Sequence, residues 1–398
     1  MVVKEKIIKN VCLTSHPLGC REYVENEVNF VKSAMDGKKG DLYKPISGDP
    51  KNVLVLGCST GYGLSSRIVN AFALKSNTIG VSYERAPSEK KCATPGWYNN
   101  KVFDELATKE NLYTKTINGD AFSLEIKESV VKTIKEDLGK IDLVIYSVAS
   151  PMRIDPFTKE SYKSVLKTIE EKYSNFNVDL KSGLINKVSL DKATEKQIED
   201  TIKVMGSEDW KLWIDYLIDN DCLNENCKTV AYSYIGPKLT YPIYREGTIG
   251  QAKKDLENGV SIINNKLKDI NGKAYVSVNK ALVTRASAVI PIVPLYIALL
   301  YEVMKNKNVH ENCIEQIYRL FSSKLPLEEI DDEGRIRLDD YEMREDVQNE
   351  VEELWKTLKE GEILSIGDLD SFKTDYSHLH GFGYKNIDYS KDVNLIIP

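Results

Sequence analysis

The chain has 398 residues, of which 54 are Lys or Arg and 60 are Asp or Glu, so its formal net charge is -6. This length suits one large α/β domain or two to three smaller lobes, and a hydrophobic content of 42% argues against general disorder. The mild negative charge gives no electrostatic reason to bind nucleic acid or an acidic membrane surface.

Hydropathy and cysteine content predict a cytoplasmic protein. The longest apolar run, residues 288–300, is shorter than the ~18 residues of a membrane span and contains two prolines. The N-terminus lacks the apolar core of a secretory signal. Seven cysteines without a CxxC pair fit free thiols in a reducing compartment. The four histidines are scattered along the chain, so we expect no metal site.

Hydrophobic periodicity gives the order of the elements. Residues 33–51 are rich in Gly, Pro, Lys and Asp and indicate a loop. Short apolar runs and helical patterns then alternate, which predicts an open parallel sheet with helices on both faces. The predicted strands cover residues 51–57, 78–84, 111–116, 141–147, 229–235 and 274–279, and the predicted helices cover residues 64–74, 126–138, 248–267 and 288–304.

We predict three parts in this α/β chain. Residues 1–50 form an N-terminal cap segment, and residues 51–310 form a Rossmann-like, doubly wound NAD-binding catalytic domain. Within that domain, residues 151–228 are polar and charged with few strand signals, which predicts an insertion of loops and helices. Residues 311–398 are dense in charge and predict a small helical appendage, whose solvated helices pack on the body.

A glycine-rich segment, Gly57 to Gly63, joins the first strand to the first helix with the spacing GxxxGxG. Glycines allow a tight turn, and the missing Cβ atoms let a pyrophosphate approach backbone N–H groups at a helix N-terminus. The position between an apolar strand and a helix strengthens this interpretation. The alternative is a plain strand-to-helix turn without a ligand.

The ends of the next strands carry further candidates for dinucleotide binding. Glu84 ends the second strand, where an acid accepts hydrogen bonds from ribose hydroxyls and repels a 2′-phosphate. We therefore expect NADH rather than NADPH, although the neighbouring Arg85 weakens the argument and a solvated strand end is the alternative. Asp120 could hydrogen-bond the adenine, and the small residues 147–150 leave room for the nicotinamide ribose.

Residues 229–254 carry four tyrosines followed by lysines. A tyrosine near a lysine suits reduction chemistry, because the ammonium favours the phenolate and lowers the tyrosine pKa. Tyr244 and Lys253 are nine residues apart and would lie on opposite faces of a regular helix. They can meet only if the helix begins between them, and Thr248 is a suitable N-cap. The residues alone leave this pairing open.

The motifs resemble the trans-2-enoyl-CoA reductases and the similar FabV-type enoyl-ACP reductases, which are enlarged relatives of the short-chain dehydrogenase/reductases. The eight residues between Tyr244 and Lys253 are specific, because ordinary short-chain reductases place three or six there. The resemblance covers nearly the whole chain. Its motifs are residues 16–20, 55–63, 94–99, 146–151, 231–236, 244–250 and 277–284.

The resemblance implies NADH-dependent reduction of the C2=C3 double bond of a trans-2-enoyl-CoA, with hydride transfer to C3. It implies that Tyr244 is the proton donor, that Lys253 binds the cofactor and tunes the site, and that Tyr234 contacts the thioester. Val148 departs conservatively from the usual Leu. The implied cofactor contacts are Gly57, Cys58, Ser59, Thr60, Gly61, Tyr62, Gly63, Tyr83, Glu84, Asp120, Ala121, Val148, Ala149, Lys253, Leu282, Val283 and Thr284.

Other functions stay open at this point. An enoyl-ACP reductase of fatty-acid biosynthesis would carry the same motifs, although an acidic carrier protein pairs weakly with a negative chain. A non-enzymatic NADH-binding module would not need Tyr244 and Lys253. The family tendency implies a monomer. The apolar helix 288–304 is a candidate wall of the acyl pocket or ordinary core, and the C-terminal tail shows no phosphate loop for a flavin.

Overall fold

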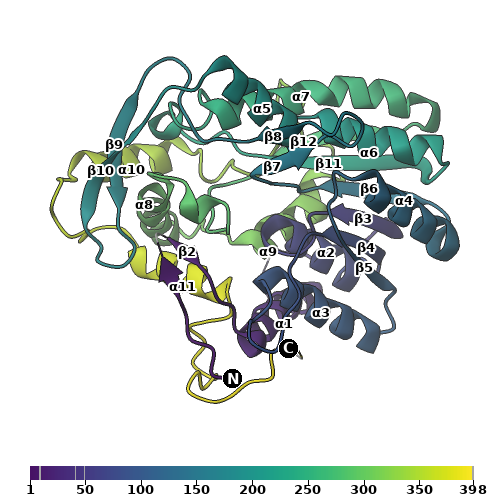
Figure 1. Cartoon of the computed structure of the whole chain (residues 1–398), viewed down its shortest axis with the longest axis horizontal. Helices are drawn as coiled ribbons and strands as arrows, with labels where there is room; N and C mark the ends of the chain where they lie inside the picture. The colour runs from purple at the N-terminus through teal and green to yellow at the C-terminus, as the bar shows by residue number, and fades with distance from the viewer. Residues whose placement is uncertain (9, 41, 49, 397–398) are drawn as a thin grey trace.

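The computed structural model describes residues 1–396 except residues 9, 41 and 49. Its centre is a seven-stranded sheet in the order β13-β12-β11-β6-β3-β4-β5 (Figure 1). Every neighbouring pair in this sheet is parallel, which confirms the predicted doubly wound architecture. The strands are β3 (Asn52–Leu56), β4 (Asn77–Ser82), β5 (Thr114–Asn118), β6 (Ile141–Tyr146), β11 (Leu223–Ser233), β12 (Lys273–Val278) and β13 (Ile336–Arg337).

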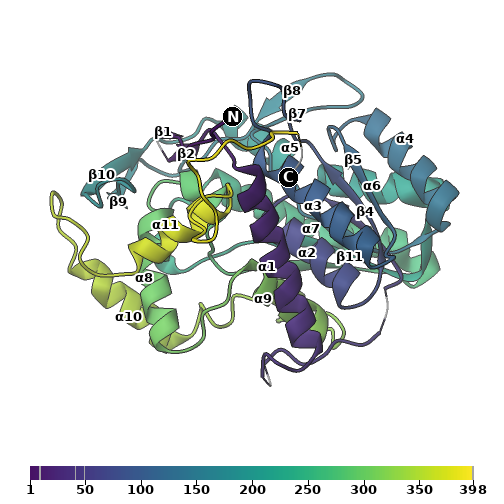
Figure 2. The same ribbon diagram turned by 90° about the horizontal axis from the view of Figure 1, so that it is seen from below.

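Helices cover both faces of the sheet. Figure 2 shows the long helix α1 lying outermost, over the helices of one face. The other face is covered by three helices, which lie between β5 and β6, between β10 and β11, and between β11 and β12. The first group comprises α1 (Pro17–Met35), α2 (Gly61–Phe72), α3 (Pro95–Lys109) and α9 (Cys313–Arg319), and the second comprises α4 (Leu124–Thr133), α6 (Glu208–Asp219) and α7 (Thr248–Leu267).

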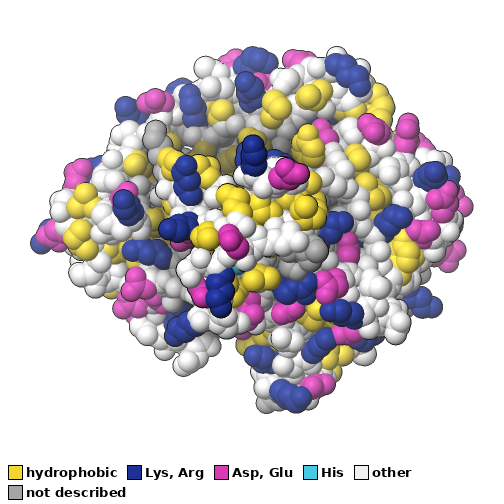
Figure 3. Space-filling model, turned by 60° about the horizontal axis from the view of Figure 1, so that its bottom comes forward, with side chains coloured by type: hydrophobic (Ala, Val, Ile, Leu, Met, Phe, Trp, Pro, Cys, Tyr) yellow, Lys and Arg dark blue, Asp and Glu magenta, His cyan; other side chains and the backbone are white. Residues whose placement is uncertain are grey.

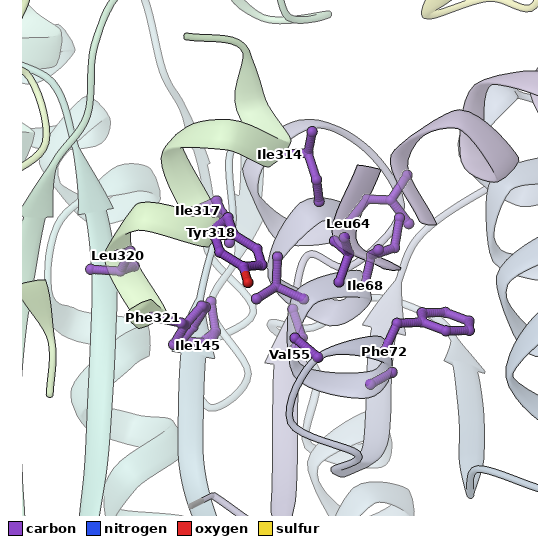
Figure 4. Packing of buried hydrophobic residues seen from close by; sticks show 14 of the residues in the cluster. Val55, Leu64, Ile68, Phe72, Ile145, Ile314, Ile317, Tyr318, Leu320 and Phe321 are labelled. Atoms are coloured by element: carbon purple, nitrogen blue, oxygen red, sulfur yellow. The ribbon is translucent and has the colours of Figure 1, made fainter. Parts of the chain in front are cut away.

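Burial on both faces explains the apolar runs of the central strands. In β3, Val53 and Val55 face the core under α2, whereas Leu54 and Leu56 face the core under α6 and α7. Figure 4 shows Val55 packed among side chains of α2, β6 and the α9 region. A strand covered on both faces has no polar side to alternate with, so its sequence is a continuous hydrophobic run.

The predicted central strands and helices are present, and α7 has the predicted bounds, but β11 begins six residues before the predicted strand 229–235 and α8 begins five residues after the predicted start at residue 288. The prediction of only loops and helices in residues 151–228 is wrong. Besides helices α5 (Glu195–Met205) and α6 and the first residues of β11, that region holds two antiparallel hairpins, whose polar, partly exposed residues give no apolar run. The hairpins are formed by β7 (Met152–Ile154) with β8 (Ser161–Lys163), and by β9 (Tyr173–Val178) with β10 (Ile185–Leu190).

A second lobe packs against the loops that follow β11 and β12, on the left in Figure 1. It combines the β9–β10 hairpin with α8 (Val293–Asn306), α10 (Glu345–Lys356) and α11 (Leu369–His378). The C-terminal segment therefore does more than cover the body with solvated helices, because it also adds β13 to the sheet and supplies α9 to the core. The domain boundaries at residues 50 and 310 remain predictions.

Membrane-spanning helices, disulfides and metal-ligand clusters were not expected from the sequence. Within them, no helix is long and apolar enough to cross a membrane. The seven cysteines, all in the described part, are free thiols. No group of three or more metal-ligating side chains comes together in the part of the chain that the structure describes.

Candidate active site

The glycine-rich turn after β3 makes close backbone approaches that only glycine permits. Gly57 has φ +87, and a Cβ atom there would overlap the carbonyl oxygen of Ser147. A Cβ atom on Gly63 would overlap the carbonyl oxygen of Gly57. The N–H groups of Gly57 and Cys58 both donate to the carbonyl of Val81, at 2.9 and 3.0 Å. The glycines are thus required by the fold of this turn before any ligand is considered.

The turn leads into a helix N-terminus without a side-chain cap. Thr60 is the N-cap of α2, and its side chain accepts no hydrogen bond from the first turn. The first N–H groups of such a helix attract anions, so these residues fit the pyrophosphate of a dinucleotide. The side chains of Cys58 and Tyr62 turn away from this position. Cys58 is buried, and the Tyr62 hydroxyl donates to the carbonyl of Lys280 at 2.8 Å.

Glu84 lies beside this turn, in contact with it. The Ser59 hydroxyl donates to its carboxylate at 2.7 Å, and Arg285 forms an ion pair with it at 3.2 Å. The side chain of Glu84 is 7% exposed, whereas Tyr83 is 81% exposed. Sequence reasoning missed Arg285, because nothing in the sequence signals that two charges 201 residues apart will meet. The carboxylate therefore lies against the glycine-rich turn, at the carboxyl end of β4.

The remaining candidates lie at the same edge of the sheet. Asp120 follows β5 and accepts a hydrogen bond from the N–H of Phe122 at 3.0 Å. The carbonyl of Ala121 accepts from the buried Lys127 ammonium at 2.7 Å. Val148 and Ala149 follow β6, next to the point where the strand order reverses between β3 and β6. Ligands of open α/β sheets bind at such a reversal.

The loop after β12 returns to the phosphate turn. Leu282 and Val283 are buried, and the N–H of Thr284 donates to the Ser287 hydroxyl at 2.9 Å. A Cβ atom on Gly61 would lie 3.7 Å from the methyl group of Thr284. The structure thus brings the predicted segment 282–284 against the N-terminus of α2, although it is more than 200 residues away in the sequence.

A pair of tyrosines and a lysine lie separately at the carboxyl end of β11. Helix α7 begins at Thr248, so Tyr244 lies in the lead-in and Lys253 in the second turn. The Lys253 ammonium donates to the carbonyl of Tyr232 at 2.9 Å. The rings of Tyr234 and Tyr244 pack edge to face with centroids 4.8 Å apart. The helix start that the pairing requires is therefore present.

The predicted effect of Lys253 on Tyr244 is wrong for the free protein. Burial raises the pKa of Tyr244, and the described residues include no hydrogen bond between its hydroxyl and the ammonium. The lysine responds to the same environment, because burial lowers the pKa of Lys253 to about 8. Tyr244 is consequently held in its protonated form, which is the form a proton donor needs.

Two regions of the chain match models of one enzyme family. A family model described as the trans-2-enoyl-CoA reductase catalytic region matches residues 91–326, and one described as its NAD(P)H-binding domain matches residues 2–89. The chain belongs to the trans-2-enoyl-CoA reductase family. It is thus an oxidoreductase of the enoyl reductase class with an NAD(P)H-binding domain.

Individual members of the family match over their full length. A trans-2-enoyl-CoA reductase [NADH] of Ruminiclostridium cellulolyticum is 47% identical, covering 99% of this chain and 98% of the relative. An enoyl-[acyl-carrier-protein] reductase [NADH] of Flavobacterium johnsoniae is 49% identical, covering 100% and 98%. The structure of Treponema denticola trans-2-enoyl-CoA reductase in complex with NAD superposes with a TM-score of 0.93, at 46% identity and over 99% and 98% of the chains.

The family also includes a C-terminal model, described as an enoyl reductase FAD-binding domain, that matches residues 330–393. The described residues of this segment do not fit a flavin dinucleotide. Helix α10 begins with Glu345 and Asp346, and the Asp368 carboxylate caps α11 by accepting from the N–H of Ser371 at 3.0 Å. A pyrophosphate would bind at a helix N-terminus, but carboxylates at both of these N-termini either occupy that position or repel the phosphates. We therefore derive no step that uses flavin.

Tyr234 and Tyr244 pack against a hydrophobic cluster that includes helix α8. The side chains of residues 295–300 in α8 are fully buried, as expected of a core helix, and their contribution to an acyl pocket stays a prediction. Figure 3 shows hydrophobic side chains gathered around and inside a hollow near the middle of one face, with charged side chains at its rim.

Proposed function

We propose that this protein is an NADH-dependent trans-2-enoyl-CoA reductase, with Tyr244 as the proton donor. One observation carries the proposal. Tyr234, Tyr244 and Lys253 all lie at the end of β11, and the loop after the neighbouring strand β12 reaches the glycine-rich turn. A reducing cofactor held at that turn and a thioester beside the tyrosines would share one edge of the sheet.

The residues of the chain have separate tasks in this reaction. NADH, when bound, supplies the hydride that is added to C3 of the enoyl thioester. The Tyr244 hydroxyl donates a hydrogen bond to the thioester oxygen, where negative charge develops, and supplies the proton that completes the reduction at C2. Tyr234 contacts the thioester group. Lys253 fixes the end of β11 by donating to the carbonyl of Tyr232, and it binds the cofactor.

Four groups would hold the dinucleotide. The backbone of residues 57–63 and the first turn of α2 would bind the pyrophosphate, and Glu84 would bind the adenosine ribose. Asp120 and the small residues after β6 would line the adenine and the nicotinamide ribose. Because the Glu84 carboxylate repels a 2′-phosphate, we propose NADH as the preferred cofactor, which is also the cofactor in the names of the Flavobacterium johnsoniae and Ruminiclostridium cellulolyticum relatives.

The carrier of the acyl group is the open part of this proposal. We favour CoA because the chain is net negative and an acyl carrier protein is acidic. An enoyl-ACP reductase is the second candidate, since relatives at 48–49% identity bear that name. NADH oxidation should be followed with crotonyl-CoA, crotonyl-ACP and a panel of enoyl-CoAs from C4 to C12. A higher kcat/KM with crotonyl-ACP would overturn the choice of CoA, and NADH binding without any turnover would indicate a non-enzymatic module.

We further propose that the enzyme works as a monomer in the cytoplasm. Free thiols at all seven cysteine positions support a reducing compartment. Light scattering of the purified protein checks the monomer, because a mass of about twice the 45.1 kDa of one chain would contradict it.

A further inference from the structure

The substrate tyrosine is hydrogen-bonded to an acid from the C-terminal segment. The Tyr234 hydroxyl donates to a carboxylate oxygen of Glu342 at 3.2 Å. Glu342 is completely buried, which is costly for a carboxylate unless its oxygens are well satisfied. It lies in the turn between β13 and α10, a region where the family model names a flavin-binding domain rather than a part of the enoyl reductase site.

Two stronger contacts hold the Glu342 carboxylate in place. The Tyr296 hydroxyl of α8 donates to it at 2.7 Å, and the backbone N–H of Ala281 donates to its other oxygen at 2.7 Å. Strand β13 fixes the turn from the other side, because the N–H of Leu338 donates to the carbonyl of Val278 at 2.9 Å. The carboxylate therefore joins α8, the loop after β12 and the end of β11.

The bond to Tyr234 is the longest of the three and the one a substrate could replace. A length of 3.2 Å is long for a hydroxyl donating to a carboxylate, whereas 2.7 Å is ordinary. Gly236 also shapes this position, since a Cβ atom there would lie 2.6 Å from the Tyr234 hydroxyl. The hydroxyl is thus held in one place but only weakly engaged.

We propose that Glu342 is a positioning residue of the reaction, which orients the Tyr234 hydroxyl toward the thioester carbonyl of the substrate. In the free enzyme the carboxylate holds the hydroxyl at the site. When a thioester enters, its carbonyl oxygen takes over the hydrogen bond from Tyr234, while Tyr296 and Ala281 keep Glu342 satisfied. This assigns a task in enoyl reduction to the C-terminal segment, and it rests on the proposed function.

A double-mutant cycle with Glu342→Gln and Tyr234→Phe tests the proposal. Glutamine keeps the shape and an oxygen for Ala281, but it no longer accepts from both tyrosines. We expect Glu342→Gln alone to lower kcat/KM for crotonyl-CoA by up to about tenfold, because the Tyr234 hydroxyl is no longer held at the site before the thioester enters and must be ordered on binding. In the Tyr234→Phe background the same substitution should change kcat/KM by less than about twofold.

Asp339 supplies the matched control. It is another fully buried carboxylate of the same turn, but it pairs with Arg337 at 2.6 Å. Asp339→Asn should lower the melting temperature while leaving the KM for crotonyl-CoA unchanged. An equal loss of kcat/KM in Asp339→Asn, an undiminished loss in the Tyr234→Phe background, or no loss in Glu342→Gln would each overturn the proposal.

A variant that fails to fold and an enzyme without the proposed activity can both be distinguished from a wrong role for Glu342. If Glu342→Gln does not fold, Tyr296→Phe enters the same cycle, because it leaves the acid in place and removes its strongest side-chain donor. Its effect on kcat/KM should also disappear in the Tyr234→Phe background, and persistence there would reject the proposal. Wild-type enzyme inactive on every enoyl thioester would instead reject the proposed function itself.

Discussion

The two ends of the site are assembled differently. The proposed dinucleotide end is centred on seven consecutive residues, Gly57 to Gly63, and the close backbone contacts of its first and last residues require glycine. The proposed thioester end combines the end of β11, the start of α7, the loop after β12 and Glu342 from the C-terminal segment. A local turn can be recognised from spacing, whereas a site made of four distant segments depends on tertiary packing.

The largest effect is expected at the thioester end. Tyr244→Phe should lower kcat for crotonyl-CoA by roughly 10²–10⁴, the usual contribution of a positioned general acid. The dissociation constant for NADH, measured by fluorescence titration, should remain nearly unchanged because the dinucleotide end is intact. Tyr241→Phe, three residues earlier and outside the proposed site, is the control. Turnover of Tyr244→Phe at the wild-type rate would remove this residue from the mechanism.

At the dinucleotide end, Gly57→Ala should weaken NADH binding by about tenfold or more. The added Cβ atom meets the carbonyl of Ser147 in a backbone conformation that alanine rarely adopts, and overpacking of this kind costs roughly 1–3 kcal/mol. Gly139→Ala is the matched control, because Gly139 has a similar φ of +78 but nothing within 4 Å of its Cβ position. If both variants lose the same NADH affinity relative to wild type, backbone strain alone, and not the phosphate turn, is responsible.

This contrast explains what the sequence could predict. The apolar runs, the glycine turn and the start of α7 are local signals that the sequence shows directly, although the polar first half of β11 lies outside its apolar run and was not predicted. The β9–β10 hairpin was missed because its polar, half-exposed residues give no apolar run. Arg285 and Glu342 were missed because their partners lie 201 and 108 residues away, and no pattern in one sequence encodes such a distance.

Glu84 combines a local signal with a distant contact, because the sequence predicts its position at the end of a strand but not its ion pair with Arg285. Glu84→Ala should raise the KM for NADH by about tenfold, since a charged group would lose its hydrogen bonds to the ribose. It should also improve the use of NADPH, because the repulsion of the 2′-phosphate is removed and Arg285 is freed from its partner. Steady-state rates with both cofactors check this. If neither KM changes, Glu84 is not the ribose ligand.

Lys253 belongs to both ends, and its titration gives the smallest expected effect. Burial lowers its pKa to about 8, with Glu257 opposing the shift. Since kcat/KM reports the free enzyme, its value should fall by about half at pH 8 and further above it, as the ammonium loses its proton. Lys253→Arg keeps a charge at high pH, so its profile should lack this decline even if its plateau is lower.

The same pKa has a consequence for folding that runs in the opposite direction. Between pH 8 and the ordinary pKa of lysine, about 10.4, the unfolded chain binds a proton that the folded chain does not. The contribution of Lys253 to the free energy of unfolding therefore rises with pH across this window. Activity should thus decline while this contribution to stability increases. Urea unfolding of wild type and Lys253→Arg at pH 8 and pH 10 measures this contribution to stability. If the wild type is still folded at pH 10 but its kcat/KM has declined, the decline comes from the titration of Lys253. If the wild type unfolds over this range, the decline follows unfolding instead.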